Sequence, residues 1–178
     1  FSLDGKQLAY GSDDGWLRMF DRTSATSKTF PENGEVEAVG FFGNAVLAAG
    51  RSGTVRLHGV SDAKLDRTLD KVRGVALSRD GKLLATRADE SLRIVDVRNG
   101  KTLSTLASAP KTVWSIAFDS SGSTIAAVTD RVHLWDTKSG ALVRTFGASK
   151  SELSAVEFSS DGKSLATADV SGTVRMFD

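Results

Sequence analysis

In this chain of 178 residues, the side chains whose types could support chemistry are two histidines and two recurring sets of charged residues. A histidine can act as a general base or ligate a metal ion. His58, however, occupies a place in a repeated phrase that other copies give to apolar or aromatic residues, and His133 occupies a place that they give to arginine. We therefore interpret both as structural and predict no catalytic residue, no cofactor-binding residue and no metal ligand.

The repeated phrase is a six-residue, strand-like segment that occurs five times. Its copies are WLRMFD at 16–21, TVRLHG at 54–59, SLRIVD at 91–96, RVHLWD at 131–136 and TVRMFD at 173–178. Four copies have arginine at the third place: Arg18, Arg56, Arg93 and Arg175. A ring of such arginines could bind phosphate, but a repeated environment also repeats its residue. We favour the second explanation, in which each arginine lays its stem over the sheet and keeps its head in water.

The aspartates that end the phrase have an equally local explanation. They are Asp21, Asp96, Asp136 and Asp178. An aspartate at a strand end can accept backbone N–H bonds in the following turn, so this repetition requires no calcium site. The glycines form no phosphate-binding loop either, because no strand–GxxxxGK[ST]–helix pattern occurs and each glycine falls where a hairpin needs it.

A longer repeat positions these residues. Its anchors are the ends of alternating apolar segments: Phe1, Phe41, Leu77, Phe118 and Phe158. Successive anchors lie 40, 36, 41 and 40 residues apart. Each anchor is followed by a turn signal such as RDG at 79–81, an apolar pair, a second polar turn and the repeated phrase. A closing segment such as LVRTF at 142–146 completes most units.

Each unit is predicted to consist of four short strands, since its apolar positions alternate with period two and no segment keeps a helical period. Four-stranded units at this spacing indicate the blades of a β-propeller, in which stacking buries both faces of each sheet. We expect an all-β fold and a single domain. Its units span about 1–30, 31–69, 70–106, 107–146 and 147–178, the first and last being incomplete.

Two stretches carry a resemblance to a known family. RVHLWDTKSGALVRTF at 131–146 has a strand, Trp-Asp, a glycine-containing turn and an outer strand, and FSSDGKSLATADVSGTVRMFD at 158–178 supplies the part before it. Both resemble the WD40 repeat, and the resemblance extends over nearly the whole chain. It implies a WD40-type β-propeller with about five four-stranded blades. Because the family's commonest form has seven blades, or on the order of 280 residues, we expect an arc of a larger propeller.

Departures from the family pattern affect the predicted packing. No copy has the Gly-His pair that the family often carries before its first strand, so the polar tetrad that uses this histidine lacks its imidazole. The family's second-turn aspartate is matched by Asp14 and Asp89 and shifted to Asp130, whereas Ser52 and Ser171 replace it elsewhere. We therefore expect the blades to pack mainly through apolar contacts, and we expect Trp135, in the copy that keeps the Trp-Asp pair, to be buried between two blades.

The composition of the chain argues against some classes of binding partner. The net charge is +1, which leaves no electrostatic footprint for nucleic acid or an anionic membrane surface. No apolar run approaches the roughly 20 residues that span a bilayer. The chain has no cysteine, hence no disulfide framework and no thiolate metal site, which fits a reducing compartment. We expect a cytoplasmic protein without a cofactor and without a nucleic-acid or membrane partner.

The resemblance implies a protein–protein interaction scaffold rather than an enzyme. Its partners would be other proteins, including the missing blades or another chain. The family's usual contact rim is formed by loops that enter the first strand and leave the second. The candidates on it are Asp13, Glu35, Arg51, Lys71, Ala88, Thr112, Glu152 and Val170. Trp114 and Trp16 are the aromatic candidates, with blade packing as the competing explanation. The alternative function is a propeller hydrolase or lyase with its site at the central channel mouth.

Overall fold

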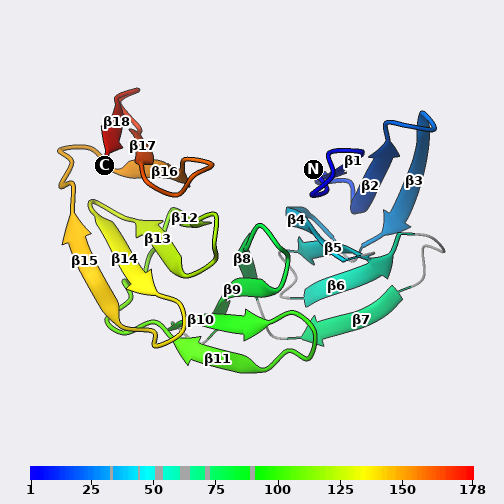
Figure 1. The fold of residues 1–178 in the computed structure, drawn as a ribbon, viewed down its shortest axis with the longest axis horizontal. Helices are drawn as coiled ribbons and strands as arrows, with labels where there is room; N and C mark the ends of the chain where they lie inside the picture. The colour runs from blue at the N-terminus through cyan, green and yellow to red at the C-terminus, as the bar shows by residue number, and fades with distance from the viewer. Residues whose placement is uncertain (33, 44, 51–53, 61–64, 71–72, 89–90) are drawn as a thin grey trace.

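All regular structure in the described residues is β-strand, and it forms five antiparallel sheets that follow one another along the chain (Figure 1). The computed structural model describes residues 1–178 except 33, 44, 51–53, 61–64, 71–72 and 89–90. We call the sheets 1 to 5 in chain order. The all-β class is confirmed, and the described part of the chain holds no helix capable of crossing a membrane.

The strands have the following bounds. Sheet 1 consists of β1 (Gln7–Gly11), β2 (Trp16–Asp21) and β3 (Thr26–Pro31). Sheet 2 consists of β4 (Val36–Phe42), β5 (Ala45–Gly50), β6 (Thr54–Gly59) and β7 (Leu65–Asp70). Sheet 3 consists of β8 (Arg73–Leu77), β9 (Leu83–Ala88), β10 (Ser91–Asp96) and β11 (Thr102–Thr105). Sheet 4 consists of β12 (Ser115–Phe118), β13 (Thr124–Val128), β14 (Val132–Asp136) and β15 (Leu142–Phe146). Sheet 5 consists of β16 (Leu153–Phe158), β17 (Leu165–Asp169) and β18 (Val174–Phe177).

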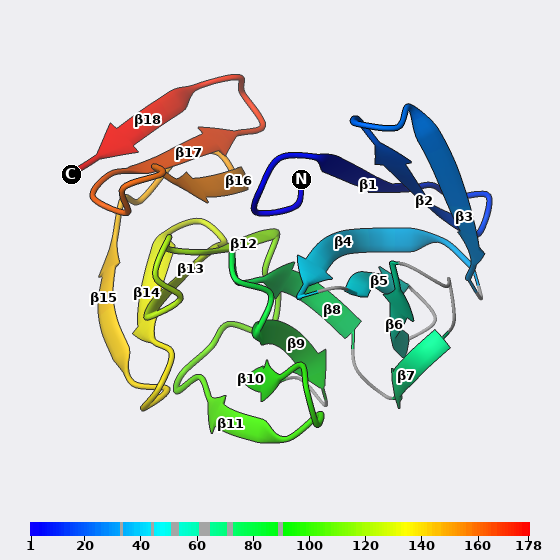
Figure 2. The same cartoon turned by 45° about the vertical axis from the view of Figure 1, so that its right-hand side comes forward.

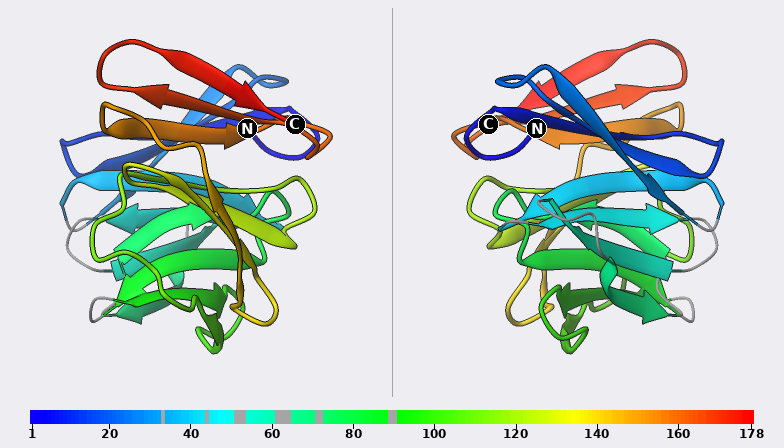
Figure 3. Two further views of the ribbon diagram at one scale, coloured as in Figure 1. Left: turned by 90° about the vertical axis from the view of Figure 1, so that its left-hand side faces the viewer. Right: turned by 90° about the vertical axis from the view of Figure 1, so that its right-hand side faces the viewer.

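The sheets are arranged radially, as the repeat predicted. The first strands β8, β12 and β16 lie toward the middle of the molecule, and the outer strands β11 and β15 lie at its periphery (Figures 1 and 2). Sheets 1 and 5 stand at the two ends of an open arc, with no described strand between them. In side view the turns project from two opposite rims (Figure 3). The fold is therefore a set of propeller-type blades whose closure into a ring is not seen.

Tight hairpin turns join the strands within each sheet. The turn between β8 and β9 contains Gly81, whose φ of +73° is one that residues with a Cβ rarely adopt. A Cβ at this position would also collide with the carbonyl oxygen of Phe41 in the neighbouring sheet. Glycine is therefore required here both for the turn and for the close approach of sheets 2 and 3.

Apolar side chains fill the spaces between adjacent sheets. Between sheets 3 and 4 the cluster includes Ile94, Leu106 and Phe118 packed around Trp135, which is 0% exposed. The predicted burial of Trp135 between blades is confirmed. Because every sheet uses the same slots, each interface repeats this arrangement with different residues.

In sheets 2 and 4, the residue at the fifth place of the repeated phrase contacts the preceding sheet. On β14, the indole Nε1 of Trp135 donates a hydrogen bond of 2.8 Å to the carbonyl oxygen of Ala107, just beyond β11. On β6, Nε2 of His58 lies 2.5 Å from a carboxylate oxygen of Glu32, just beyond β3. The His58 ring also lies 5.1 Å from that of Phe30. His58 is buried and takes part in the contact between sheets 1 and 2.

Candidate protein-interaction rim

The loops that join successive sheets meet the turns between second and third strands on one rim, which we call the crossover rim. Its described parts are 12–15, 32, 34–35, 107–114, 129–131, 147–152 and 170–173. Backbone hydrogen bonds connect the two kinds of segment. The N–H of Glu32 donates to the carbonyl of Gly15 at 2.9 Å, and the N–H of Val170 donates to the carbonyl of Glu152 at 3.0 Å. The rim is therefore built from loops whose backbones are fixed to one another.

The structure describes most of the residues predicted for this rim. Asp13, Thr112 and Glu152 are exposed, and Glu35 is partly buried. Glu152 and Val170 are brought together by their backbone hydrogen bond. The other candidates lie on different sheets around the arc. Arg51, Lys71 and the side chain of Ala88 fall outside the described residues, so their predicted places stay predictions.

Both aromatic candidates have exposed rings. Trp114 immediately precedes β12 and is 55% exposed, although its backbone N–H is fixed to the carbonyl of Val128 at 3.0 Å. Trp16 is the first residue of β2 and is also exposed. Both rings are exposed and neither is buried between the described sheets, so the structure does not favour blade packing as the explanation for either residue.

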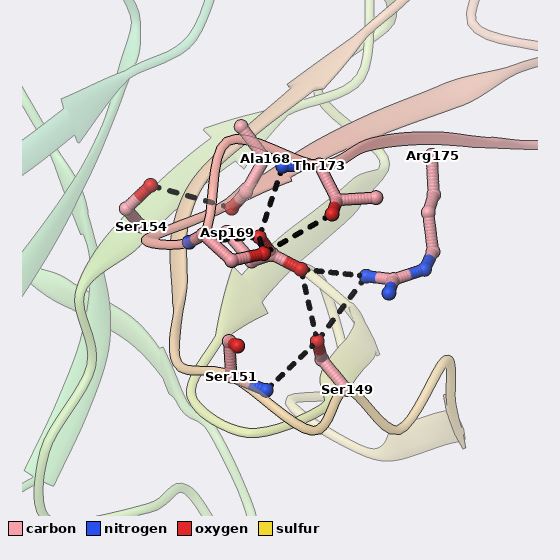
Figure 4. A network of polar contacts seen from close by, with 8 residues as sticks. Ser149, Ser151, Ser154, Ala168, Asp169, Thr173 and Arg175 are labelled. Carbon is pink, nitrogen blue, oxygen red and sulfur yellow. Dashed lines mark hydrogen bonds and ion pairs between the residues drawn. The ribbon is translucent and has the colours of Figure 1, made fainter.

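A buried carboxylate organises the rim in sheet 5 (Figure 4). Oδ1 of Asp169 accepts hydrogen bonds from the backbone N–H groups of Ser171 and Thr173, both at 3.0 Å, and from the Ser171 hydroxyl at 2.5 Å. Oδ2 accepts from Nη1 of Arg175 at 3.0 Å and from the hydroxyl of Ser149 at 3.2 Å. These bonds, led by that of the Ser171 hydroxyl, hold the pKa of Asp169 far below its usual range. The network ties the loop that enters β16 to the turn that leaves β17.

The corresponding turn of sheet 1 exchanges the two residue types. Ser12 stands at the place of Asp169, and Asp14 stands at the place of Ser171. Asp14 accepts from Nη2 of Arg18 at 2.5 Å, from the hydroxyl of Ser12 and from the N–H of Trp16 at 3.1 Å. The guanidinium of Arg18 is the main cause of the strongly lowered pKa of Asp14. Either order of serine and aspartate therefore closes the turn.

In sheet 4, His133 stands at the third place of the phrase, which is arginine in the other four copies. Nε2 of His133 lies 3.4 Å from the hydroxyl of Thr129, and Nδ1 lies 3.2 Å from that of Thr145. The ring also stacks on Trp135, with centroids 5.6 Å apart. Burial lowers the pKa of His133. These contacts hold the His133 ring against residues of its own sheet.

The expectation that the blades pack mainly through apolar contacts is confirmed by the apolar clusters between adjacent sheets. Sheet 5 adds a polar network to this packing, in which Ser149 and Ser171 both bind Asp169. One expectation is wrong. The heads of Arg18 and Arg175 do not rest in water alone, since both bind turn carboxylates. The repeated Ser-x-Asp and Asp-x-Ser spacing was the available signal for Asp169.

The aspartates that end the third strands lie on the opposite rim. Oδ1 of Asp21 accepts from the backbone N–H groups of Thr23 and Ser24 at 2.8 and 3.0 Å, and Asp96 and Asp136 accept from their own following turns in the same way. These three confirm the predicted role. Asp178 instead accepts from a serine hydroxyl of its own sheet. Among the described residues no three potential metal ligands cluster together.

A hollow of about 510 Å³ lies on the same opposite rim, between the first strands of sheets 3, 4 and 5. Its charged lining residues are Arg79, Asp119 and Glu157. Both carboxylate oxygens of Asp119 are occupied by its own turn, accepting from the N–H of Thr124 at 3.1 Å and the hydroxyl of Ser121 at 2.7 Å. Because the first strands lie toward the middle of the molecule, this hollow is where the alternative site would be sought.

Part of the chain that forms this rim is similar to a known family of repeats. The WD domain, G-beta repeat family matches residues 100–136 and 140–178, which include most of sheets 4 and 5 and the turn of Asp169. Those matches coincide with the four-strand periodicity of the structure. Residues 100–136 and 140–178 are therefore two WD40 repeats. The remaining sheets have the same strand order as these WD40 units, with β1 to β11 in the positions that the repeat predicts.

Relatives of the chain are longer proteins. An uncharacterized WD repeat-containing protein of Synechocystis is 33% identical over 52% of this chain and 28% of its own length. The Arabidopsis WD repeat-containing protein VIP3 is 29% identical over 60% of this chain and 39% of its own length. The Arabidopsis pre-mRNA-processing factor 19 homolog 2 is 30% identical over 96% of this chain and 35% of its own length. The chain thus spans well under half of the length of each of these relatives.

Proposed function

We propose that this WD40 protein is a non-catalytic protein–protein interaction scaffold that binds partner proteins at its crossover rim. The observation that carries the proposal is the exposed ring of Trp114 on a backbone-fixed loop. An exposed aromatic side chain on a rigid segment can supply contact area at little cost in ordering. Val170 adds exposed apolar surface from the turn of sheet 5, and Thr112 and Glu152 supply exposed polar groups from the loops that lead into sheets 4 and 5.

The repeat architecture supports the same function. Stacked sheets form a rigid frame whose loops can vary without disturbing the core, as is typical of binding surfaces. The alternative hydrolase or lyase has weaker support, because one of the two carboxylates that line the channel-side hollow, Asp119, is held by its own turn, which leaves Glu157 to act without it. A catalytic acid or base would need a free carboxyl within reach of a substrate.

Quantitative affinity capture from cell extract tests this function. We expect Trp114→Ala to reduce recovery of a captured protein by about tenfold, the loss typical of a central aromatic contact. Leu103→Ala is the matched control, because Leu103 is 49% exposed but lies on the outer strand β11, away from the crossover rim. Equal recovery by wild type and Trp114→Ala, with loss in Leu103→Ala, would place binding elsewhere and overturn the proposal.

A further inference from the structure

The loop that carries Trp114 joins sheets 3 and 4 and spans residues 107–114. Backbone hydrogen bonds fix its two ends to sheet 4. The N–H of Ala107 donates to the carbonyl of Gly140, in the turn between β14 and β15, at 2.8 Å. The N–H of Trp114 donates to the carbonyl of Val128, the last residue of β13, at 3.0 Å. Sheet 4 therefore holds both ends of the loop.

The loop begins with a backbone conformation that is costly for its residue. Ser108 has a φ of +53°, in the left-handed region that residues with a Cβ rarely adopt. Such a conformation persists only where the surrounding contacts determine it. No strand lies between residues 107 and 114 to provide a regular ladder. The course of the loop thus depends on contacts with neighbouring sheets.

A side chain of sheet 3 supplies such a contact in the middle of the loop. Arg87 lies on β9 and is partly buried, and its Nη2 donates a hydrogen bond to the carbonyl oxygen of Lys111. An arginine suits this contact, because its guanidinium carries several N–H donors at the end of a long stem. The fixed carbonyl lies three residues before Trp114.

This arginine is peculiar to sheet 3. It lies on the second strand, opposite the second place of the repeated phrase. The other four sheets have a residue without a side-chain donor at the matching place: Gly11, Ala49, Val128 and Ala168. The propeller repeat therefore does not require an arginine there. The sheet that has one is the sheet that precedes the exposed tryptophan.

We propose that Arg87 is a positioning residue of the crossover rim, which fixes the loop 107–114 through the carbonyl of Lys111 and so holds the ring of Trp114 in place. This inference rests on the proposed function, in which Trp114 contacts a partner protein. Arg87 acts through the loop and does not itself contact the partner. A loop that is ordered before binding avoids the ordering cost that a mobile loop would add.

Native-state proteolysis tests whether Arg87 holds the loop. Lys111 is exposed, so trypsin can cut the bond that follows it when the loop opens. Arg87→Gln should speed this cut about fivefold, the change in a local opening equilibrium expected from the loss of one hydrogen bond. Arg87→Lys keeps a donor and should recover part of the protection. Cleavage after Lys101 is the internal reference, because a loss of global stability would speed both cuts alike.

Affinity capture tests the consequence for binding. Arg87→Gln should lower about twofold the recovery of the protein that Trp114→Ala loses, because a fraction of the molecules then has an open loop. Arg22→Gln is the matched control. Nη1 of Arg22 donates to the carbonyl of Gly5 at 2.9 Å on the opposite rim, so this variant removes the same kind of bond elsewhere. It should leave both the recovery and the cleavage after Lys111 unchanged.

Separate outcomes decide the proposal and the function on which it rests. Unchanged cleavage after Lys111 in Arg87→Gln, or equal acceleration after Lys101 and Lys111, would overturn the positioning role. Faster cleavage after Lys111 with full recovery, while Trp114→Ala loses the partner, would overturn it too, since the ring would then need no fixed loop. Full recovery by Trp114→Ala would overturn the proposed function, whereas cleavage after Lys111 would still decide whether Arg87 holds the loop.

Discussion

His58 and Trp135 occupy the same place on the third strands of sheets 2 and 4, and they connect their sheets to the preceding ones by different means. Trp135 combines a large buried ring with one neutral hydrogen bond to Ala107. His58 offers a smaller ring and faces the buried carboxylate of Glu32. The fifth place can therefore hold a ring with a polar edge by either chemistry, although other copies fill it with Phe20, Val95 and Phe177.

The Trp135 and His58 contacts depend on different groups in the preceding sheet. The carbonyl that Trp135 uses is present whatever the residue at position 107. The carboxylate that His58 uses depends on one side chain, which also lies 3.8 Å from Nε of Arg56. Burying charged groups costs desolvation energy, so such a cluster contributes little net stability but is costly to break. The apolar interface should thus depend on ring size, and the polar interface on keeping both partners.

The largest expected effect is at Trp135. Trp135→Ala should lower the free energy of unfolding by about 3–5 kcal/mol, because it leaves a large cavity between sheets 3 and 4. Equilibrium urea unfolding measures this change. A loss below about 1 kcal/mol would mean that the indole does not hold this interface together.

A smaller effect is expected at the polar interface. Glu32→Ala should cost about 1–3 kcal/mol, because it leaves the buried His58 without its acceptor. The double variant Glu32→Ala/His58→Phe should cost less than Glu32→Ala alone, since both polar partners are then removed. A double-mutant cycle in urea gives the coupling between the two residues. Additive losses would show that they do not act as a pair.

The smallest effect concerns the carboxylates of the crossover rim and depends on pH. Hydrogen bonds hold the pKa of Asp169 below its ordinary value of 3.8, so its ionised form stabilises the fold above that pH. This stabilisation is lost as the pH falls through the lowered folded pKa. Asp169→Asn should therefore melt below wild type at neutral pH, with the gap narrowing in strong acid. A gap that stays constant down to about pH 2 would contradict the assigned hydrogen bonds. Asp14→Asn, in a more exposed turn, is the matched comparison.

Much of the fold followed from the sequence because it is periodic. Alternating apolar positions and glycine turns specified strands, and the repeated phrase identified the third strand of each sheet, including the burial of Trp135. The polar contacts were harder to predict because they join segments through residues that differ from copy to copy. Ser149 and Asp169 meet only when the loop before β16 folds back on the turn after β17. Glu32 lies in no repeated pattern, so its pairing with His58 required the structure.

The exposure of a side chain could not be predicted from its place in the repeated six-residue phrase. Met19 and Met176 stand in nearly identical sequences, and Met19 is buried because sheet 2 follows sheet 1, whereas the given sequence holds no sheet after sheet 5. Whether a neighbouring sheet covers a strand is a property of the assembly and not of its residues. The same limit applies to Trp114, whose type suggested a contact but whose exposure only the structure could show.

Site-specific photo-crosslinking tests most directly whether the crossover rim binds partner proteins. A photoreactive amino acid placed at Thr112 lies on the rim beside Trp114 and leaves that ring intact. The same group placed at Val143 lies on an exposed outer strand away from the rim. The proposed function predicts covalent adducts with a cellular protein from position 112 and none from position 143. Adducts from position 143 with none from position 112 would contradict it.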